Sequence, residues 1–300
     1  ALASAHIENK QPSLAEKTLK KIIKNDDRNI THRLMLVQLW LDKIDKTPEK
    51  MVLLDAILNI NPKHQKAIIL KSSHLIQQKK FDEAISFAEV IEAQYPTVLL
   101  GYIMHGDVYW AQKQFDKAYK KYAQAYELTA VNKVLNRMAD SLFLQEKSDE
   151  AINLLKQQLE NKKLNPAPIH LKMADIFLKT NQQQEAINHY KAVLVHKNRD
   201  LTALNNLAYL YIERQEFNQA INFATKAYRL SPAIPAIIDT YAYALLKKGV
   251  IAIFFSGTSE LAIEYVNSIT ELSIASKISL SAAQGISNGV LLARVGYGTE

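Results

Sequence analysis

Apolar positions along the chain fall into paired segments that are joined by short polar turns. In one pair, the first helix is expected to end near Gln112, and the second begins with Phe-Asp-x-Ala at Phe115. A small alanine recurs at this place in each second segment, where two helices must approach closely, at intervals of 34, 33, 35 and 34 residues. These alanines are Ala84, Ala118, Ala151, Ala186 and Ala220. This period predicts a stack of helix-turn-helix repeats.

Other positions keep the same register. Gly106 and Tyr109 come twelve and nine residues before Ala118, and Tyr122 and Ala125 come four and seven residues after it. This pattern resembles the tetratricopeptide repeat. The resemblance covers about residues 1–249 and implies an all-α fold, a right-handed superhelix of helix-turn-helix units with a helical C-terminal tail. In such a solenoid each repeat buries its apolar face only against its neighbours.

The expected array contains a truncated repeat at 1–29, six full repeats and a half repeat whose helix ends at Gly249. The full repeats are expected at about 31–64, 65–98, 99–131, 132–166, 167–200 and 201–234. Prolines mark several of the loops, because proline denies a helix one N–H donor. Three positions depart from the pattern: Lys50 takes the small-alanine position, and Ala130 and Lys163 take the proline position.

The composition changes after Gly249. Six of the eight glycines lie from this residue onward, and no proline follows Pro235. The small residues Gly285, Gly289 and Ala293 recur at four-residue intervals, which suits close helix packing and is common in membranes. Both soluble packing and membrane association are open for residues 250–300, and so is a third role as a cap on the solenoid.

Two further resemblances concern the end of the chain. Ser281-Ala-Ala-Gln-Gly-Ile and Gly289-x-Leu-Leu-Ala-Arg-x-Gly resemble the C-terminal domain of YcjF-like bacterial inner-membrane proteins. The join at Gly249 falls inside a repeat, so we treat 250–300 as a fusion or as a gene-model join. The run Pro235-Ala-Ile-Ile-Asp-Thr resembles repeat arrays of bacterial exopolysaccharide and protein-sorting (PrsT-like) systems, which implies the bacterial cell envelope.

No sequence motif for catalysis, cofactor binding or metal binding is present. The chain has no cysteine, no Gly-rich phosphate loop and no His-Glu-x-x-His. We expect His105 and His170 to be histidines at the edge of the core, and His189 and His196 have no third ligand placed beside them. The net charge is +7, of which residues 250–300 contribute −2 and the repeats therefore +9. We interpret this as solvated lysines on outer helices, with an acidic partner or a membrane surface as the alternative, and nucleic acid is not an expected partner.

The family resemblance places the ligand surface on the first helices of the repeats. Asp107, Asp140 and Asp175 take one position in three successive repeats, outside the packing positions. Trp110 and Phe143 follow three residues after the first two of them. The other predicted groove residues are Asn136, Asn205 and Tyr209. These side chains predict an acidic, aromatic-edged groove, although solvated aspartates are the simpler alternative.

We therefore predict a non-catalytic scaffold that binds a basic, apolar peptide or protein segment. The alternative is a membrane-associated assembly component that is anchored through residues 250–300.

Overall fold

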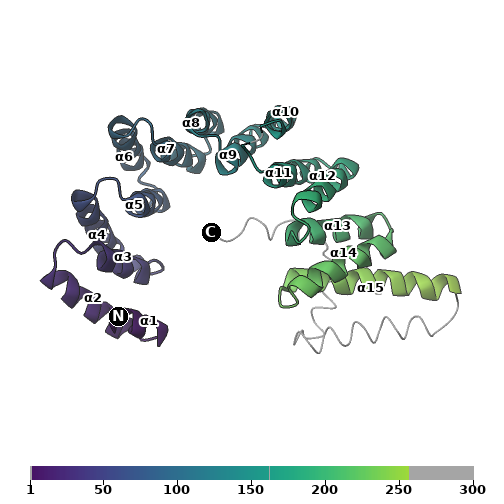
Figure 1. Cartoon of the computed structure of the whole chain (residues 1–300), viewed down its shortest axis with the longest axis horizontal. Coiled ribbons are helices and arrows are strands. Elements are labelled where there is room, and N and C mark those ends of the chain that lie inside the picture. Colours follow the sequence, from purple (N-terminus) through teal and green to yellow (C-terminus); the bar gives the residue numbers. More distant parts are fainter. Residues whose placement is uncertain (1, 162, 257–300) are drawn as a thin grey trace. The chain divides into compact units, whose positions relative to one another are not determined.

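A computed structural model describes residues 2–161 and 163–256 (Figure 1). This part of the chain contains fifteen α-helices and no strand, so the predicted all-α fold class is confirmed. The chain divides into two compact units, Ala1–Lys147 and Ser148–Glu300. Each unit is described separately below.

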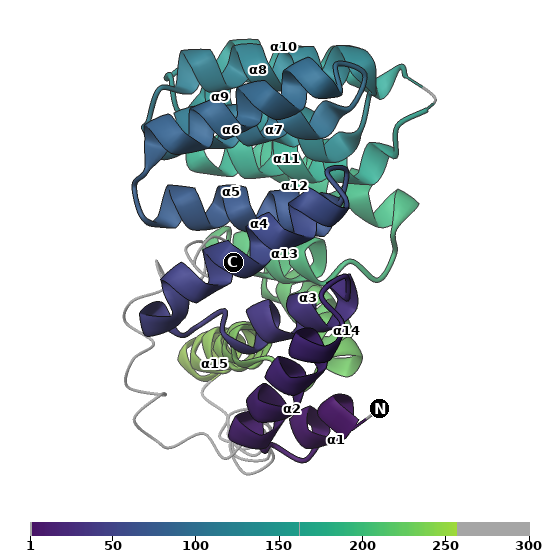
Figure 2. The same ribbon diagram turned by 90° about the vertical axis from the view of Figure 1, so that its left-hand side faces the viewer.

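The first unit contains nine helices and one short 3₁₀ helix. Their bounds are α1 Leu2–Glu8, α2 Pro12–Asn25, α3 Ile30–Leu39, η1 Ile44–Lys46, α4 Thr47–Ile60, α5 Gln65–Gln77, α6 Phe81–Gln94, α7 Leu99–Ala111, α8 Phe115–Leu128 and α9 Asn132–Phe143. Each helix packs against the next one along the chain, and Figure 2 shows the hairpin of α1 and α2 beside α3.

The second unit contains the remaining six helices. They are α10 Ser148–Leu159, α11 Pro166–Lys179, α12 Gln183–His196, α13 Leu201–Glu213, α14 Phe217–Leu230 and α15 Pro235–Ser256. Because α15 runs through Gly249 to Ser256, the prediction that this helix ends at Gly249 is wrong. None of the described helices is both long and apolar enough to cross a membrane. Residues 257–300, which hold most of the predicted tail, lie outside the described residues.

The small alanines of the predicted repeats lie inside the protein. All five are fully buried, which confirms the register on which the repeats were predicted. Lys50 occupies this position in the pair α3–α4 and is also buried, with 4% exposure. Its ammonium group donates a hydrogen bond to the carbonyl oxygen of Leu41 at 3.2 Å, in the longer connection that contains η1. The longer connection thus supplies the partner that a buried lysine requires.

Six first helices end in the same backbone motif. The residue five positions before the small alanine, or before Ala15 in the first pair, has a positive φ of 55–63° although it is not glycine. These residues are Lys10, Lys79, Lys113, Glu146, Asn181 and Gln215. In the turn after α7, the N–H of Lys113 bonds to the carbonyl of Trp110 and the N–H of Gln114 to that of Tyr109, both at 2.9 Å. This Schellman motif satisfies the last carbonyls of the helix and turns the chain into its partner.

Candidate functional site

Two of the three predicted groove aspartates bind tyrosines inside the protein. The hydroxyl of Tyr122, a fully buried residue of α8, donates a hydrogen bond to Oδ1 of Asp107 on α7 at 2.7 Å. Arg137 on α9 forms an ion pair with the same carboxylate and donates to the Tyr122 hydroxyl at 3.2 Å. Asp107 therefore ties together three successive helices.

The same arrangement occurs in the second unit. The hydroxyl of buried Tyr190 on α12 donates to Oδ1 of Asp175 on α11 at 2.8 Å, and Asn206 on α13 donates to that hydroxyl at 2.8 Å. In both cases the aspartate lies eleven residues before the small alanine and the tyrosine four residues after it. The third group lies fourteen residues before the small alanine of the next repeat. We call this set the Tyr–Asp–donor link.

The Tyr–Asp–donor link changes the prediction for the aspartates. They were expected to lie outside the packing, yet Asp107 and Asp175 are the acceptors of buried tyrosines. The sequence signal that was missed is the tyrosine four residues after the small alanine. In the repeat that begins at α9 this position is Leu155, which has no hydroxyl to offer Asp140.

In the first unit, Arg137 interacts with the charges of two aspartates, Asp107 and Asp140. Burial lowers the pKa of Arg137, and the nearby charge of Asp140 opposes this effect. Burial also raises the pKa of Tyr122 above its usual range, with a smaller contribution from Asp140. Asp107 is thus paired with Arg137, and Asp140 lies near enough to act on the charge of the same guanidinium.

The predicted aromatic residues lie at the ends of first helices. The ring of Trp110 packs edge-on against Phe115 of the same pair, with ring centroids 5.3 Å apart. Trp110 and Phe143 are both half-buried. In the second unit, Tyr209 on α13 is half-buried, and its pKa is raised by burial and by its neighbours Glu213 and Tyr243.

The two predicted asparagines retain unused hydrogen-bonding capacity. Oδ1 of Asn136 on α9 and Oδ1 of Asn205 on α13 are buried and accept no hydrogen bond from the described residues. Both asparagines lie fifteen residues before the small alanine of their repeat. Asn136 belongs to the first unit with Asp107, Trp110 and Asp140, whereas Asn205 belongs to the second with Asp175 and Tyr209.

Two of the histidines singled out from the sequence have polar partners. His105 is 3% exposed, and its Nδ1 lies 2.9 Å from Glu92, which also pairs with Lys121 at 2.8 Å. Burial, reinforced by Lys121, lowers the pKa of His105.

In the second unit, Nδ1 of His170 lies 3.0 Å from Nδ1 of His189. Burial followed by the charge of His170 lowers the pKa of His189 to about 4. Among the described residues no group of three or more potential ligands is placed to hold a metal ion.

Two clefts of the first unit lie between second helices, on either side of α4. The cleft between α2 and α4 has a volume of about 380 Å³, and its floor includes Leu36 of α3 and Trp40, the residue that follows this helix. The cleft between α4 and α6 has a volume of about 790 Å³ and includes Phe87 and Val90. The sequence prediction placed no ligand surface here.

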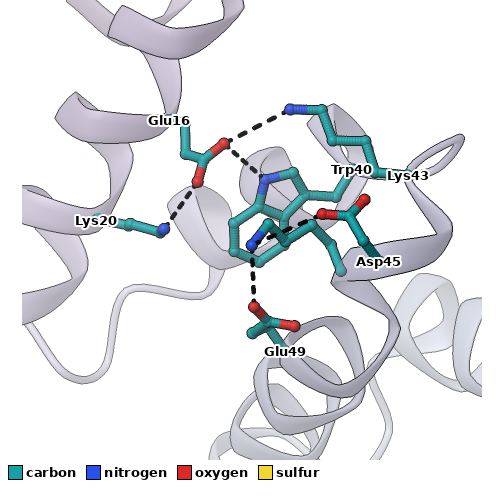
Figure 3. Close-up of polar contacts among 7 residues, drawn as sticks. Glu16, Lys20, Trp40, Lys43, Asp45 and Glu49 are labelled. Carbon is teal, nitrogen blue, oxygen red and sulfur yellow. Dashed lines mark hydrogen bonds and ion pairs between the residues drawn. The ribbon is translucent and has the colours of Figure 1, made fainter.

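A polar cluster borders the smaller cleft (Figure 3). Glu16 accepts hydrogen bonds from Lys20 at 2.7 Å and from the indole N–H of Trp40 at 3.0 Å, and it lies 3.6 Å from Lys43. These bonds, that of Lys20 first, lower the pKa of Glu16 to about 2. Glu49 pairs with Lys46 at 3.2 Å. Both carboxylates are therefore neutralised within the protein.

Comparison with known proteins supports the repeat assignment over one repeat. Residues 201–234, which form α13 and α14, match the family model of the tetratricopeptide repeat. The chain is 35% identical to the Protein STIP1 homolog of Dictyostelium discoideum over 106 residues, which are 33% of this chain and 19% of that protein. The match thus spans about a fifth of the relative's length.

Solved structures with similar folds include two helical-repeat proteins. The chain is 17% identical to the Cut9–Hcn1 hetero-tetramer of APC/C, with a TM-score of 0.47 over 81% of this chain and 48% of that one. It is 17% identical to pilF of Pseudomonas aeruginosa, with a TM-score of 0.46 over 71% of this chain and 96% of that one. At this level of similarity the neighbours carry no conclusion about function.

Proposed function

We propose that this protein is a non-catalytic interaction scaffold that binds a peptide or protein segment along the first helices of its repeats. The observation that carries the proposal is the repetition of Asn136 and Asn205 at one position of two first helices, each with a buried acceptor that lacks a partner among the described residues. A buried polar group without a partner costs free energy, and we propose that a bound segment supplies the missing partner here. An amide side chain both donates and accepts, which suits the backbone of a bound peptide.

The ligand class follows from the charges around these asparagines. In the first unit, Asp107 and Asp140 take the same position on successive first helices, and we propose that this acidic line favours a cationic side chain. The half-buried rings of Trp110 and Phe143 favour an apolar one, since partly buried aromatic residues are frequent anchors at interfaces. We therefore infer a basic, apolar segment as the ligand.

Fluorescence anisotropy with the full chain tests this proposal. The probes are two fluorescein-labelled peptide pools of about 12 residues each, one rich in lysine and leucine and the other rich in glutamate and leucine. Asn136→Ala should weaken binding of the basic pool by about 3- to 10-fold, which corresponds to one hydrogen bond. It should not lower stability, because the variant removes an acceptor that has no partner among the described residues.

Asn222→Ala is the matched control, since Asn222 is an exposed asparagine on the second helix α14. Asp140→Asn should weaken binding and reduce its dependence on salt. We avoid Asp107 as a binding test because its loss also affects Tyr122. The proposal would be refuted if the parent chain and Asn136→Ala bound the basic pool with equal affinity. It would also be refuted if the parent chain preferred the acidic pool and Asn136→Ala abolished that preference.

A second candidate function is that of a membrane-associated assembly component of the bacterial cell envelope. It rests on the small-residue spacing of Gly285, Gly289 and Ala293 and on the resemblances stated above. Sedimentation of the full chain with neutral and anionic phospholipid vesicles tests it. A chain that stays in the supernatant with both kinds of vesicle would contradict it.

A further inference from the structure

The cleft between α2 and α4 is a second surface, separate from the first-helix residues discussed above. Its apolar walls come from Ile23 on α2 and from Val52 and Leu53 on α4. Val52 is 67% exposed, whereas Trp40 beneath the cleft is 2% exposed. The cleft is therefore an open apolar hollow over a fixed floor, and its volume of about 380 Å³ lies within the range of ligand pockets.

The floor of this cleft is fixed in place by several side-chain contacts. The indole N–H of Trp40 is bonded to Glu16, and the ammonium of Lys20 lies 5.2 Å from the centre of the Trp40 ring (Figure 3). Trp40 also belongs to a buried cluster with Leu19 and Leu36. A side chain that enters the cleft thus meets a preformed surface and does not have to order it, which lowers the cost of binding.

The charges around the cleft are positive and unbalanced. The acidic residues beside it, Glu16 and Glu49, are each paired with a lysine. By contrast, Lys17, Lys21 and Lys24 stand on the exposed face of α2, and within the described residues no ion pair is recorded for them. Lys24 also lines the cleft. An anionic group that approaches the cleft therefore meets lysines that are not already paired.

The neighbouring cleft between α4 and α6 differs in this respect. Its lysine, Lys71, pairs with Asp55 at 2.6 Å and lies 4.5 Å from the centre of the Phe87 ring. The lysine that lines that cleft is thus paired. Among the residues that line the two hollows, Lys24 is the lysine for which no ion pair is recorded.

We propose that the cleft between α2 and α4 binds an acidic, apolar helix of a partner protein, with one apolar side chain in the cleft and carboxylates on the lysines of α2. A helix suits the site because the cleft runs between two helices over a third, which is the geometry in which an amphipathic helix lays its apolar face. The charge of this ligand is opposite to that proposed for the first-helix face. The two surfaces therefore predict two different partner segments.

The test uses the full chain and a fluorescein-labelled amphipathic peptide of about 16 residues, roughly 24 Å long as a helix, with leucines on one face and glutamates beside them. A copy with every glutamate replaced by lysine is the ligand control. Val52→Asp should weaken binding of the acidic peptide at least 10-fold, because it places a carboxylate where the apolar side chain and the acidic flanks must lie. Lys24→Glu should weaken it by about 5- to 10-fold and reduce its dependence on salt.

Two matched variants control for the substitutions themselves. Val90→Asp makes the same change in the neighbouring cleft, where Val90 is 49% exposed, and Lys163→Glu makes the same charge change at an exposed loop residue. Both should leave the affinity within about twofold, the scatter expected for distant surface changes. Asn136→Ala should also leave it unchanged, which separates this proposal from the one for the first-helix face.

Several outcomes would overturn the inference. One is that Val90→Asp weakens binding as much as Val52→Asp, and another is that the lysine copy of the peptide binds as tightly as the acidic one. A third is that the peptide does not bind, while Val52→Asp and Lys24→Glu release the protein from anionic phospholipid vesicles. That result would assign the cleft to a membrane surface instead of a protein helix.

Discussion

The Tyr–Asp–donor link makes a direct prediction for Tyr122→Phe. The substitution removes only the hydroxyl, which donates to Asp107 at 2.7 Å and accepts from Arg137 at 3.2 Å. Hydrogen bonds to charged groups contribute about 1.5–3 kcal/mol to stability. Because Asp107 keeps its ion pair with Arg137 in the variant, we expect a loss near the lower end of that range, about 1.5–2 kcal/mol.

Urea unfolding followed by circular dichroism measures this loss. Tyr228→Phe is the matched control, since Tyr228 is a half-buried tyrosine of a second helix and no hydrogen bond of its hydroxyl is recorded among the described residues. That variant should change the free energy of unfolding by no more than about 0.5 kcal/mol. A double-mutant cycle of Tyr122→Phe with Asp107→Asn should give a coupling energy of at least about 0.5 kcal/mol. Equal losses in Tyr122→Phe and Tyr228→Phe, or a coupling near zero, would refute the role of the link.

Three further predictions concern packing and pH. Gly106→Ala should destabilise the chain, because the added Cβ would lie 2.5 Å from Cε1 of the buried Tyr122 ring. The overpacking cost of about 1–3 kcal/mol exceeds the gain in helix propensity of about 1 kcal/mol. An unchanged midpoint of urea unfolding would contradict this prediction. Ala118→Leu and Ala220→Leu should each lower the free energy of unfolding by about 1–3 kcal/mol, since both alanines are fully buried between packed helices. Unchanged thermal unfolding of both variants would show that the register of the repeats is wrong. The unfolded chain protonates His189 near pH 6.5 and the folded chain only near pH 4. The contribution of His189 to stability should therefore be constant above about pH 7, and it should fall as the pH is lowered from about 6.5 to about 4. The pH dependence should be shallower in His189→Gln, and identical pH profiles would argue against this origin.

Helix positions could be predicted from the sequence because a single steric requirement fixes them. A buried small alanine marks the first turn of a second helix, as Ala118 does in α8. The predicted start of that helix at Phe115 matches the start of α8. Lys50 can take the same position because its ammonium group donates a hydrogen bond to the carbonyl oxygen of Leu41 in the longer connection. It fails at Gly249, because glycine lowers helix propensity without ending a helix in an otherwise apolar run, and α15 continues to Ser256.

The turns between paired helices could not be predicted in the same way. The left-handed residue that ends these six first helices is Lys, Glu, Asn or Gln, so no single residue type marks it. A non-glycine residue in this conformation costs about 1–2 kcal/mol. The two backbone bonds of each Schellman motif, such as those from Lys113 and Gln114, offset that cost. The motif is thus imposed by the pairing of the helices and not by the local sequence.

The hydrogen bonds of the predicted groove aspartates could not be predicted, for a related reason. Position along the first helices correctly singled out Asp107 and Asp175 as equivalent residues, but it did not reveal that each accepts a bond from a tyrosine on the next helix. That bond depends on one residue of the second helix, and Leu155 shows that the repeat tolerates its absence. An aspartate in this position therefore joins two helices of a repeat where the second helix carries a tyrosine opposite it. The asparagines four residues before the aspartate position, Asn136 and Asn205, keep acceptors without a partner among the described residues and are the stronger candidates for contact with a ligand.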